Sequence, residues 1–185
     1  MEYIEILTSN ARIQTARLVL RPFMVNDKDD VFEYGSDPET LEHLIWEGVT
    51  TLNEAEKSII GYLMKPGVYA LELKDTHKCI GGIDLRLDPE HEKAGFGYAL
   101  NRKYWNQGYM TEALAGVICL CFGRLNLNRI EACHFTGNEG SGRVMQKCGM
   151  NWEGISIEGE KVKGVFRDVV HYGLTRGEWQ KKSEG

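Results

Sequence analysis

A single glycine, Gly108, stands where a strand-like segment gives way to an apolar, helix-like run. It lies in Y-W-N-Q-G-Y-M-T-E-A (104–113), after F-G-Y-A-L (96–100) and before A-L-A-G-V-I-C-L-C-F (113–122). The first N–H groups of a helix lack intrahelical partners and carry partial positive charge, so they bind phosphate where small residues let it approach. The amides of such a row would belong to Gln107, Gly108, Tyr109, Met110 and Thr111, with Arg102 and Lys103 just upstream. From these residues alone, an ordinary helix start is the better interpretation, because one glycine before a helix is common.

Cysteine and histidine are the other residue types that could form a site. The five cysteines (Cys79, Cys119, Cys121, Cys133 and Cys148) are odd in number and contain no C-x-x-C pair, and the five histidines are scattered. We therefore expect free, mostly buried thiols in a reducing cytosol and no metal site. A dinucleotide-binding domain is also disfavoured, since no G-x-G-x-x-G precedes the helix.

Composition and charge narrow the class of protein. The chain has 185 residues, 42% of them hydrophobic and 26% charged, which suits one soluble domain with a full core. The formal net charge of -5 disfavours nucleic-acid binding, and a basic peptide or a polyamine would be a more natural partner. The N-terminus does not resemble a signal peptide and no apolar run is long enough to span a membrane, so we expect a cytoplasmic protein.

The elements that must position the Gly108 loop follow from hydrophobic periodicity and turn residues. We expect strands over 17–23, 68–73, 79–87, 94–100, 129–135, 152–157 and 166–175. We expect helices over 26–35, 37–46, 51–65, 109–123 and 138–150. The three strands between 68 and 100 should form an antiparallel meander, and the strand–helix–strand unit that follows implies a parallel pair with a right-handed crossover. Gly95 and Gly97, inside the third of these strands, indicate a bulge or a close approach to the backbone.

Several spaced motifs, read in order, resemble one known family. The stretch G-Y-A-L-N-R-K-Y-W-N-Q-G-Y-M-T-E-A (97–113) resembles the acetyl-CoA loop of the GNAT acetyltransferases, and most closely that of the RimJ/RimL type, which acetylates protein N-termini. The segments at 13–23, 128–132, 138–150 and 164–179 resemble the opening strand, the next core strand, the N-x-x-S-x-x-V-x-x-K-x-G-F helix and the closing strand of that branch. The resemblance covers about nine-tenths of the chain, and motifs matching in order are far more specific than one motif alone.

The resemblance implies the fold. We expect one α/β (α+β) GNAT domain over 1–185, with a mixed, mostly antiparallel twisted sheet and helices on both faces. A central parallel pair of strands would be splayed by a bulge. Residues 1–12 and 180–185 are expected to be flexible tails.

The resemblance also implies acetyl-CoA as co-substrate and assigns site residues. The amides of 107–111 would bind its pyrophosphate, Ala99 and Leu100 would pair with the pantetheine arm through their backbones, and an amide near Gly97 would face the thioester carbonyl. Asn138 would hydrogen-bond the pantetheine, although Asn at this position also suits a plain helix cap. Many GNAT enzymes carry a Tyr seven residues after this Asn, where this chain has Met145; the RimL-like pattern makes Ser141 the candidate acid and Glu160 the candidate base.

Two points are left open by the sequence: the effect of residues that depart from the family pattern, and the identity of the acceptor. Asn106 replaces a glycine of the branch and Met110 replaces a small residue, and Met110 could crowd the pyrophosphate. Glu112 is interpreted as structural, and Tyr34 and Trp46 could line an acceptor pocket. The predicted activity is transfer of an acetyl group to a primary amine of a protein N-terminus, a polyamine or a small molecule, by a monomer or homodimer. The alternative is a GNAT-fold module that binds or senses CoA without turnover.

Overall fold

A computed structural model describes residues 2–183 of the chain. Its strands form one 8-stranded sheet in the order β1-β2-β3-β4-β5-β6-β8-β7. The strands are β1 (Ile13–Gln14), β2 (Leu18–Arg21), β3 (Val68–Leu73), β4 (Cys79–Asp88), β5 (Lys93–Leu100), β6 (Arg129–Phe135), β7 (Asn151–Val162) and β8 (Val165–Thr175). The α-helices are α1 (Glu2–Ser9), α2 (Lys28–Gly35), α3 (Pro38–Leu41), α4 (Leu52–Ser58), α5 (Tyr109–Gly123), α6 (Glu139–Lys147) and α7 (Arg176–Ser183). Short helical turns are η1 (Val25–Asp27), η2 (Ile59–Leu63), η3 (Pro89–His91) and η4 (Arg102–Tyr104).

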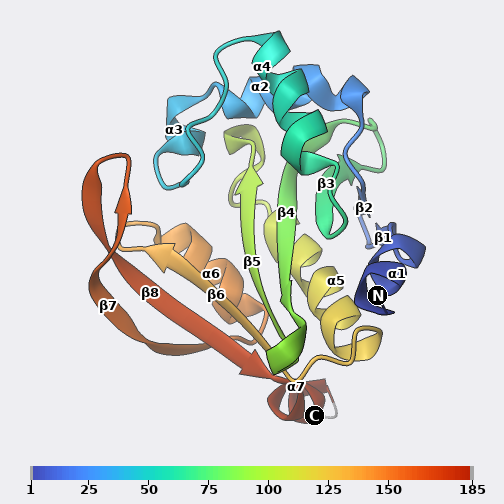
Figure 1. Ribbon diagram of the computed structural model, residues 1–185, viewed down its shortest axis with the longest axis vertical. Coiled ribbons are helices and arrows are strands. Elements are labelled where there is room, and N and C mark those ends of the chain that lie inside the picture. Colours follow the sequence, from blue (N-terminus) through green and yellow to red (C-terminus); the bar gives the residue numbers. More distant parts are fainter. Residues whose placement is uncertain (1, 184–185) are drawn as a thin grey trace.

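The sheet divides where β5 meets β6. Neighbouring strands pair antiparallel everywhere except at β5 and β6, whose parallel pairing joins only 93–95 of β5 to 129–131 of β6. Beyond that point the two strands diverge, and Figure 1 shows them opening like the arms of a V from the lower end of the molecule. The predicted meander, parallel pair and mixed sheet are therefore confirmed.

The opening of the V does not come from the predicted bulge. Between residues 81–88 of β4 and 93–100 of β5, all of which the structure describes, the pairing register does not shift. β5 instead stays paired with β4 while it parts from β6, so the second half of β5 has a neighbour on one side only.

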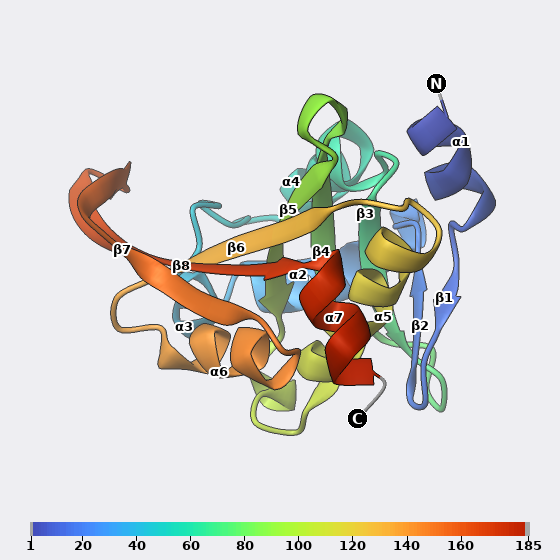
Figure 2. The same cartoon turned by 90° about the horizontal axis from the view of Figure 1, so that it is seen from below.

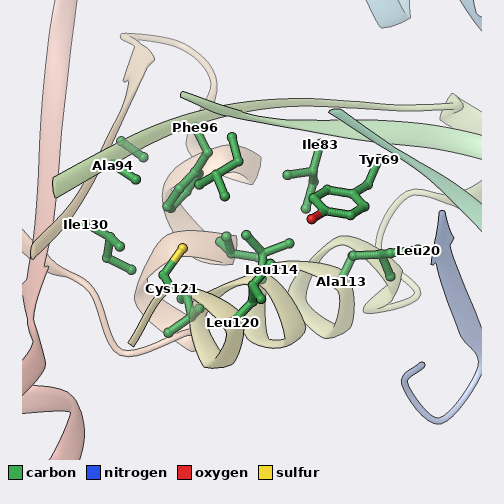
Figure 3. Close-up of a cluster of buried hydrophobic side chains, with 14 of the residues drawn as sticks. Leu20, Tyr69, Ile83, Ala94, Phe96, Ala113, Leu114, Leu120, Cys121 and Ile130 are labelled. Atoms are coloured by element: carbon green, nitrogen blue, oxygen red, sulfur yellow. The ribbon is translucent and has the colours of Figure 1, made fainter. Parts of the chain in front are cut away.

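The main core lies between the sheet and α5. Apolar side chains on the α5 side of the strands meet the apolar side chains of the helix there. Figure 3 shows Tyr69, Ile83 and Phe96 reaching from the strands toward Ala113 and Leu114 of α5. The two helices that follow diverging strands, α5 and α6, cover the same face of the sheet (Figure 2). Burial of the apolar side chains of α5 against the sheet fixes the position of the helix and therefore of its N-terminus.

A second, smaller core holds α2 and α4 against the face of β3 opposite the main core, since its Val68 and Ala70 alternate with Tyr69 and Leu71 of the main core. Tyr34 is 3% exposed within it, and the Trp46 ring packs edge-on against Tyr34 with 6.3 Å between ring centroids. Tyr34 is therefore a core residue, and Trp46 packs partly buried against the same core; neither lines the cavity beside α5, where the prediction expected them to line a pocket.

Several local predictions also need correction. The helix expected over 37–46 ends at Leu41, and residues 2–9, expected within a flexible tail, form α1 with Leu7 buried. Residues 180–183, expected in the other flexible tail, belong to α7; residues 1 and 184–185 lie outside the described part. The cysteines are free, but only Cys79 and Cys121 are buried, since Cys119 and Cys133 are exposed and Cys148 is intermediate.

Candidate functional site

The loop before α5 takes its shape from two residues with left-handed backbone conformation. Asn106 has φ of 59° and Gly108, the N-cap of α5, has φ of 81°. Glycine adopts this region without strain, and asparagine tolerates it better than most other residues. The change from the branch's glycine to Asn106 therefore keeps the backbone conformation of the loop. The first amides of this 15-residue helix have no capping side chain at Gly108, so they remain available to bind an anion.

Arg17 and Glu112 brace this loop from the β1–β2 side. Glu112 accepts hydrogen bonds from Thr15 Oγ1 (2.6 Å), from the Arg17 backbone N–H (2.6 Å) and from Arg17 Nε (2.7 Å). Burial opposes ionisation of Glu112, but these donors outweigh it and lower the pKa of the carboxyl. Arg17 also donates to the Gln107 carbonyl oxygen (3.0 Å) and lies 4.1 Å above the Tyr109 ring. The structural role predicted for Glu112 is confirmed, and Arg17 offsets its negative charge beside the helix N-terminus.

Met110 does not crowd the loop. Its side chain is 4% exposed and belongs to the main hydrophobic core. Because its side chain packs inward, Met110 presents little surface to the cavity that it helps to line.

A cavity of about 360 Å³ adjoins this loop. Four segments form its walls: the second half of β5, the loop and first turn of α5, the first turns of α6, and the chain around α3. The predicted site residues that line it are Ala99, Leu100, Gly108, Tyr109, Met110, Thr111, Asn138 and Ser141. Gly97, Gln107 and Glu160 are not among its lining residues.

The pairing of β5 with β4 shows which backbone groups of β5 face β4 and which face the opening. The Asn101 N–H donates to the Ile80 carbonyl (2.8 Å), and Ile80 stands opposite Asn101 in continuation of the β4–β5 register. Since backbone groups alternate sides along a strand, Gly97 and Ala99 also bond toward β4, whereas Tyr98 and Leu100 point their backbones into the V. Tyr98 therefore provides an amide near Gly97 that faces the opening, as does the backbone of Leu100, whereas the backbone of Ala99 bonds toward β4; the roles of these groups toward a ligand remain predictions.

At the other wall, Asn138 and Ser141 begin α6. The Asn138 side-chain oxygen accepts from the Ser141 N–H (3.2 Å), so Asn138 is the helix cap that the sequence also allowed. The Ser141 hydroxyl lies 2.8 Å from the phenol oxygen of Tyr98, whose hydroxyl also donates to the Ser141 carbonyl (3.1 Å). This contact joins α6 to β5 across the cavity.

Glu160 lies on the opposite face of the sheet from Ser141. It stands opposite Arg167 in the β7–β8 ladder, and Arg167 shares a face with Val169 and His171 by strand alternation. His171 pairs with Cys133 of β6. Although Cys133 as a residue is exposed, partial desolvation of its thiol, followed by the charge of Glu160, raises the pKa of that thiol. α6 instead packs over His134, on the other face, where a side chain at Gly142 would meet the His134 ring at 2.8 Å. The two candidate catalytic residues thus lie on opposite faces of the sheet.

Cations near the cavity come from α6 rather than from the residues upstream of Gly108. Arg102 pairs with Asp37 and Glu39, and Lys103 pairs with Glu33. Arg143 and Lys147 line the cavity and lie four residues apart, on one side of α6. Sequence reasoning missed this pair, although their spacing after Asn138 could have indicated it; it also missed His43 and its neighbours beside α3, whose place in the wall depends on tertiary packing.

Within residues 2–183, no cluster of three or more His, Cys, Asp or Glu side chains is arranged to hold a metal ion. No helix in this part of the chain is both long and apolar enough to cross a membrane.

Comparison with known proteins identifies the class. Residues 17–151 match the family model described as "Acetyltransferase (GNAT) domain". The chain is 32% identical to "Uncharacterized N-acetyltransferase p20" of Bacillus licheniformis, over 90% of this chain and 97% of that protein. It is 36% identical to "Putative ribosomal N-acetyltransferase YdaF" of Bacillus subtilis over 62% of each chain. A crystal structure of a GNAT-family acetyltransferase from Bacillus anthracis superposes with a TM-score of 0.83 at 27% identity, covering 90% of this chain and 99% of that one.

The chain therefore belongs to the GNAT acetyltransferase family. It is an acetyl-CoA-dependent N-acetyltransferase, and the resemblance to the RimL-like branch is confirmed. An enzyme is thus favoured over the CoA-sensing module that the sequence left open.

Proposed function

We propose that this enzyme transfers the acetyl group of acetyl-CoA directly to a primary amine in the opening between β5 and β6. The observation that carries the proposal is the position of this opening. It joins the α5 N-terminus and the cavity on one face of the sheet to the Glu160 side on the other. A thioester held in the opening is accessible from both faces, so no covalent enzyme intermediate is needed.

Acetyl-CoA binding is assigned to groups along the cavity. The amides of residues 107–111 bind the pyrophosphate, and Arg143 and Lys147 add positive charge for phosphate groups on the α6 side. The pantetheine arm runs along the unpaired side of β5, where it takes the hydrogen bonds that β6 would otherwise supply. The Asn138 oxygen is occupied by its helix cap, so its amide NH2 is the group that reaches the pantetheine.

The proposed chemistry places three groups around the thioester carbon. Glu160 takes a proton from the ammonium form of the amine, whose lone pair then attacks the carbonyl carbon, and the nitrogen loses its second proton to solvent as the tetrahedral intermediate collapses to the amide. The Tyr98 backbone N–H stabilises the oxyanion. As the C–S bond breaks, its electron pair goes to sulfur, which takes the Ser141 hydroxyl proton; Ser141 regains a proton from solvent, into which Glu160 releases the one it took.

The α-amine of a peptide is the proposed acceptor. The relative YdaF, a putative ribosomal N-acetyltransferase, supports this class, and the net charge of -5 favours a cationic acceptor. An α-amine has a pKa of ~8, so a fraction is already neutral at physiological pH and one carboxylate suffices to remove the proton.

The test offers acetyl-CoA with matched acceptors. Lysine-free peptides with a free N-terminus, the same peptides with a blocked N-terminus, spermidine and small amines are compared by thiol release and product mass. We expect release and one added acetyl group only with free α-amines. Release with spermidine but not with peptides would overturn the peptide assignment, and no release with any amine would overturn the proposed activity.

A further inference from the structure

Tyr98 and Ser141 form a hydroxyl pair inside the cavity that the proposed chemistry uses only in part. Tyr98 comes from the part of β5 that has parted from β6, and Ser141 comes from the first turn of α6. Their side-chain oxygens are 2.8 Å apart, and both residues line the cavity. Residues 43 apart in the chain thus place two hydroxyl groups where the thioester sulfur would leave.

The number of protons decides what this pair can do. Each hydroxyl has one proton, and the serine oxygen can both donate and accept. If Ser141 donates to the phenol, its proton is occupied and unavailable to sulfur. If the phenol donates to Ser141 Oγ, the serine O–H is free to turn toward a ligand while its oxygen is held in place.

The positions of the two acceptor atoms of Ser141 fit the second arrangement. The phenol oxygen lies 2.8 Å from Ser141 Oγ and 3.1 Å from the Ser141 carbonyl oxygen, so its one proton can be shared between them in a three-centre hydrogen bond. In this geometry Tyr98 is a donor to both oxygens of Ser141 and leaves the serine O–H free. Burial raises the pKa of Tyr98 well above its ordinary value, although its hydrogen bond with Ser141 acts in the opposite direction, so the phenol keeps its proton.

We propose that Tyr98 is a positioning residue whose phenol donates to Ser141 Oγ and directs the serine O–H toward the sulfur of acetyl-CoA. The inference rests on the proposed function of Ser141 as the proton donor. Tyr98 keeps its own proton, so the balance of the transfer step is unchanged: sulfur gains the serine proton, and serine regains one from solvent. Acting through Ser141, Tyr98 contributes nothing once that hydroxyl is removed.

A structural role would give different results. Tyr98 could simply tie β5 to α6, and a second tyrosine provides the matched control for that possibility. The Tyr172 hydroxyl of β8 accepts from Gln146 Nε2 of α6 (3.2 Å), so Tyr172→Phe also removes one sheet-to-α6 hydrogen bond without touching Ser141.

The experiment measures kcat, KM for acetyl-CoA and Tm for wild type, Tyr98→Phe, Ser141→Ala, the double variant and Tyr172→Phe, with a saturating acceptor. We expect kcat to fall about tenfold in Tyr98→Phe, since one hydrogen bond is lost. In Ser141→Ala, kcat should fall about a hundredfold, since the acid is lost. The double variant should match Ser141→Ala, KM for acetyl-CoA should change less than threefold throughout, and Tyr172→Phe should keep wild-type kcat.

Each other outcome overturns a distinct claim. Wild-type kcat in Tyr98→Phe, losses that multiply in the double variant, or an equal loss in Tyr172→Phe would overturn the positioning role while the transfer activity stands. Wild-type kcat in Ser141→Ala would overturn the acid assignment and this inference with it. An absence of turnover by the wild-type enzyme would overturn the proposed function itself, and the inference that depends on it.

Discussion

At the scale of single residues, the loop before α5 depends on backbone conformation more than on side-chain chemistry. Asn106 and Gly108 both have positive φ, and their left-handed conformations turn the chain so that α5 begins with its amides open. Arg17 lies beside this turn: a side chain at Gly108 would be 3.5 Å from Arg17 Nη2, which is ordinary contact. A substitution at Gly108 is therefore opposed by conformation and not by lack of space.

Gly108→Ala tests this conformational requirement. A non-glycine residue forced into the left-handed region costs ~1–2 kcal/mol, so we expect a lower Tm and an increase of several-fold in KM for acetyl-CoA. Gly123→Ala, at the other end of the same helix, is the matched control because φ there is not positive and nothing lies within 4 Å of the added methyl. That control should be neutral or slightly stabilising. Equal effects in the two variants, by calorimetry and steady-state kinetics, would contradict the assigned role of the loop.

At the scale of elements, ion pairs fix the α2–α3 segment against the chain that leads into the loop. Glu33 of α2 accepts from Lys103 Nζ (2.7 Å), Lys78 Nζ (2.6 Å) and Asn101 Nδ2 (3.2 Å). Hydrogen bonds from Lys103 and then Lys78 hold the pKa of Glu33 at about 2, against the effect of burial. These contacts tie α2, which directly precedes α3, to the chain that leads into the loop.

The low pKa of Glu33 predicts that the stability loss caused by Glu33→Gln depends on pH. A carboxyl whose folded-state pKa is about 2, below its unfolded value of ~4.3, contributes stability above pH ~4.3 that is lost as pH falls toward 2. We expect Tm at pH 7 to fall by the equivalent of about 1 kcal/mol or less, because these ion pairs are partly exposed. The difference from wild type should shrink as pH is lowered from 5 to 2.5. Glu47→Gln, at an exposed glutamate outside these ion pairs, should show no such trend; a constant difference for Glu33→Gln would contradict the assignment.

Sequence predicted the elements that local residues encode, but not the features that depend on tertiary pairing and packing. The G-Y-A-L and Y-W-N-Q-G-Y segments predicted β5, the loop and α5, because local periodicity and the turn residues encode them. Which backbone groups of β5 face the V was not predictable, since that depends on the pairing of Asn101 with Ile80 across β4. The packing of Trp46 against Tyr34 and the exposure of Cys133 likewise depend on tertiary structure rather than on local sequence.

At the scale of the whole molecule, acetyl-CoA binding should stabilise the fold, since the cavity walls come from separate elements. Residues of β5, α5, α6 and the α3 region converge there, so a ligand that binds only the folded chain ties them together. At a ligand concentration of 100 times Kd, linkage contributes ~2.7 kcal/mol, which corresponds to a rise in Tm of roughly 5–10 °C for a chain of this size. Differential scanning fluorimetry with CoA checks this, and Gly108→Ala should show a smaller rise at equal ligand concentration. No rise at millimolar CoA would contradict the assigned site.

The central claim is that one opening in the sheet exposes the thioester to groups on both faces. Glu160 tests it most directly, because it does not line the cavity and, in the proposed mechanism, acts on the amine through the opening between β5 and β6. The decisive measurement is kcat/KM for a free N-terminal peptide, in wild type and Glu160→Gln, from pH 6.5 to 9.5. We predict a loss of about a hundredfold at pH 7 that narrows above pH ~8, where the amine is neutral without a base. Wild-type kcat/KM for Glu160→Gln at pH 7 would contradict the two-sided arrangement.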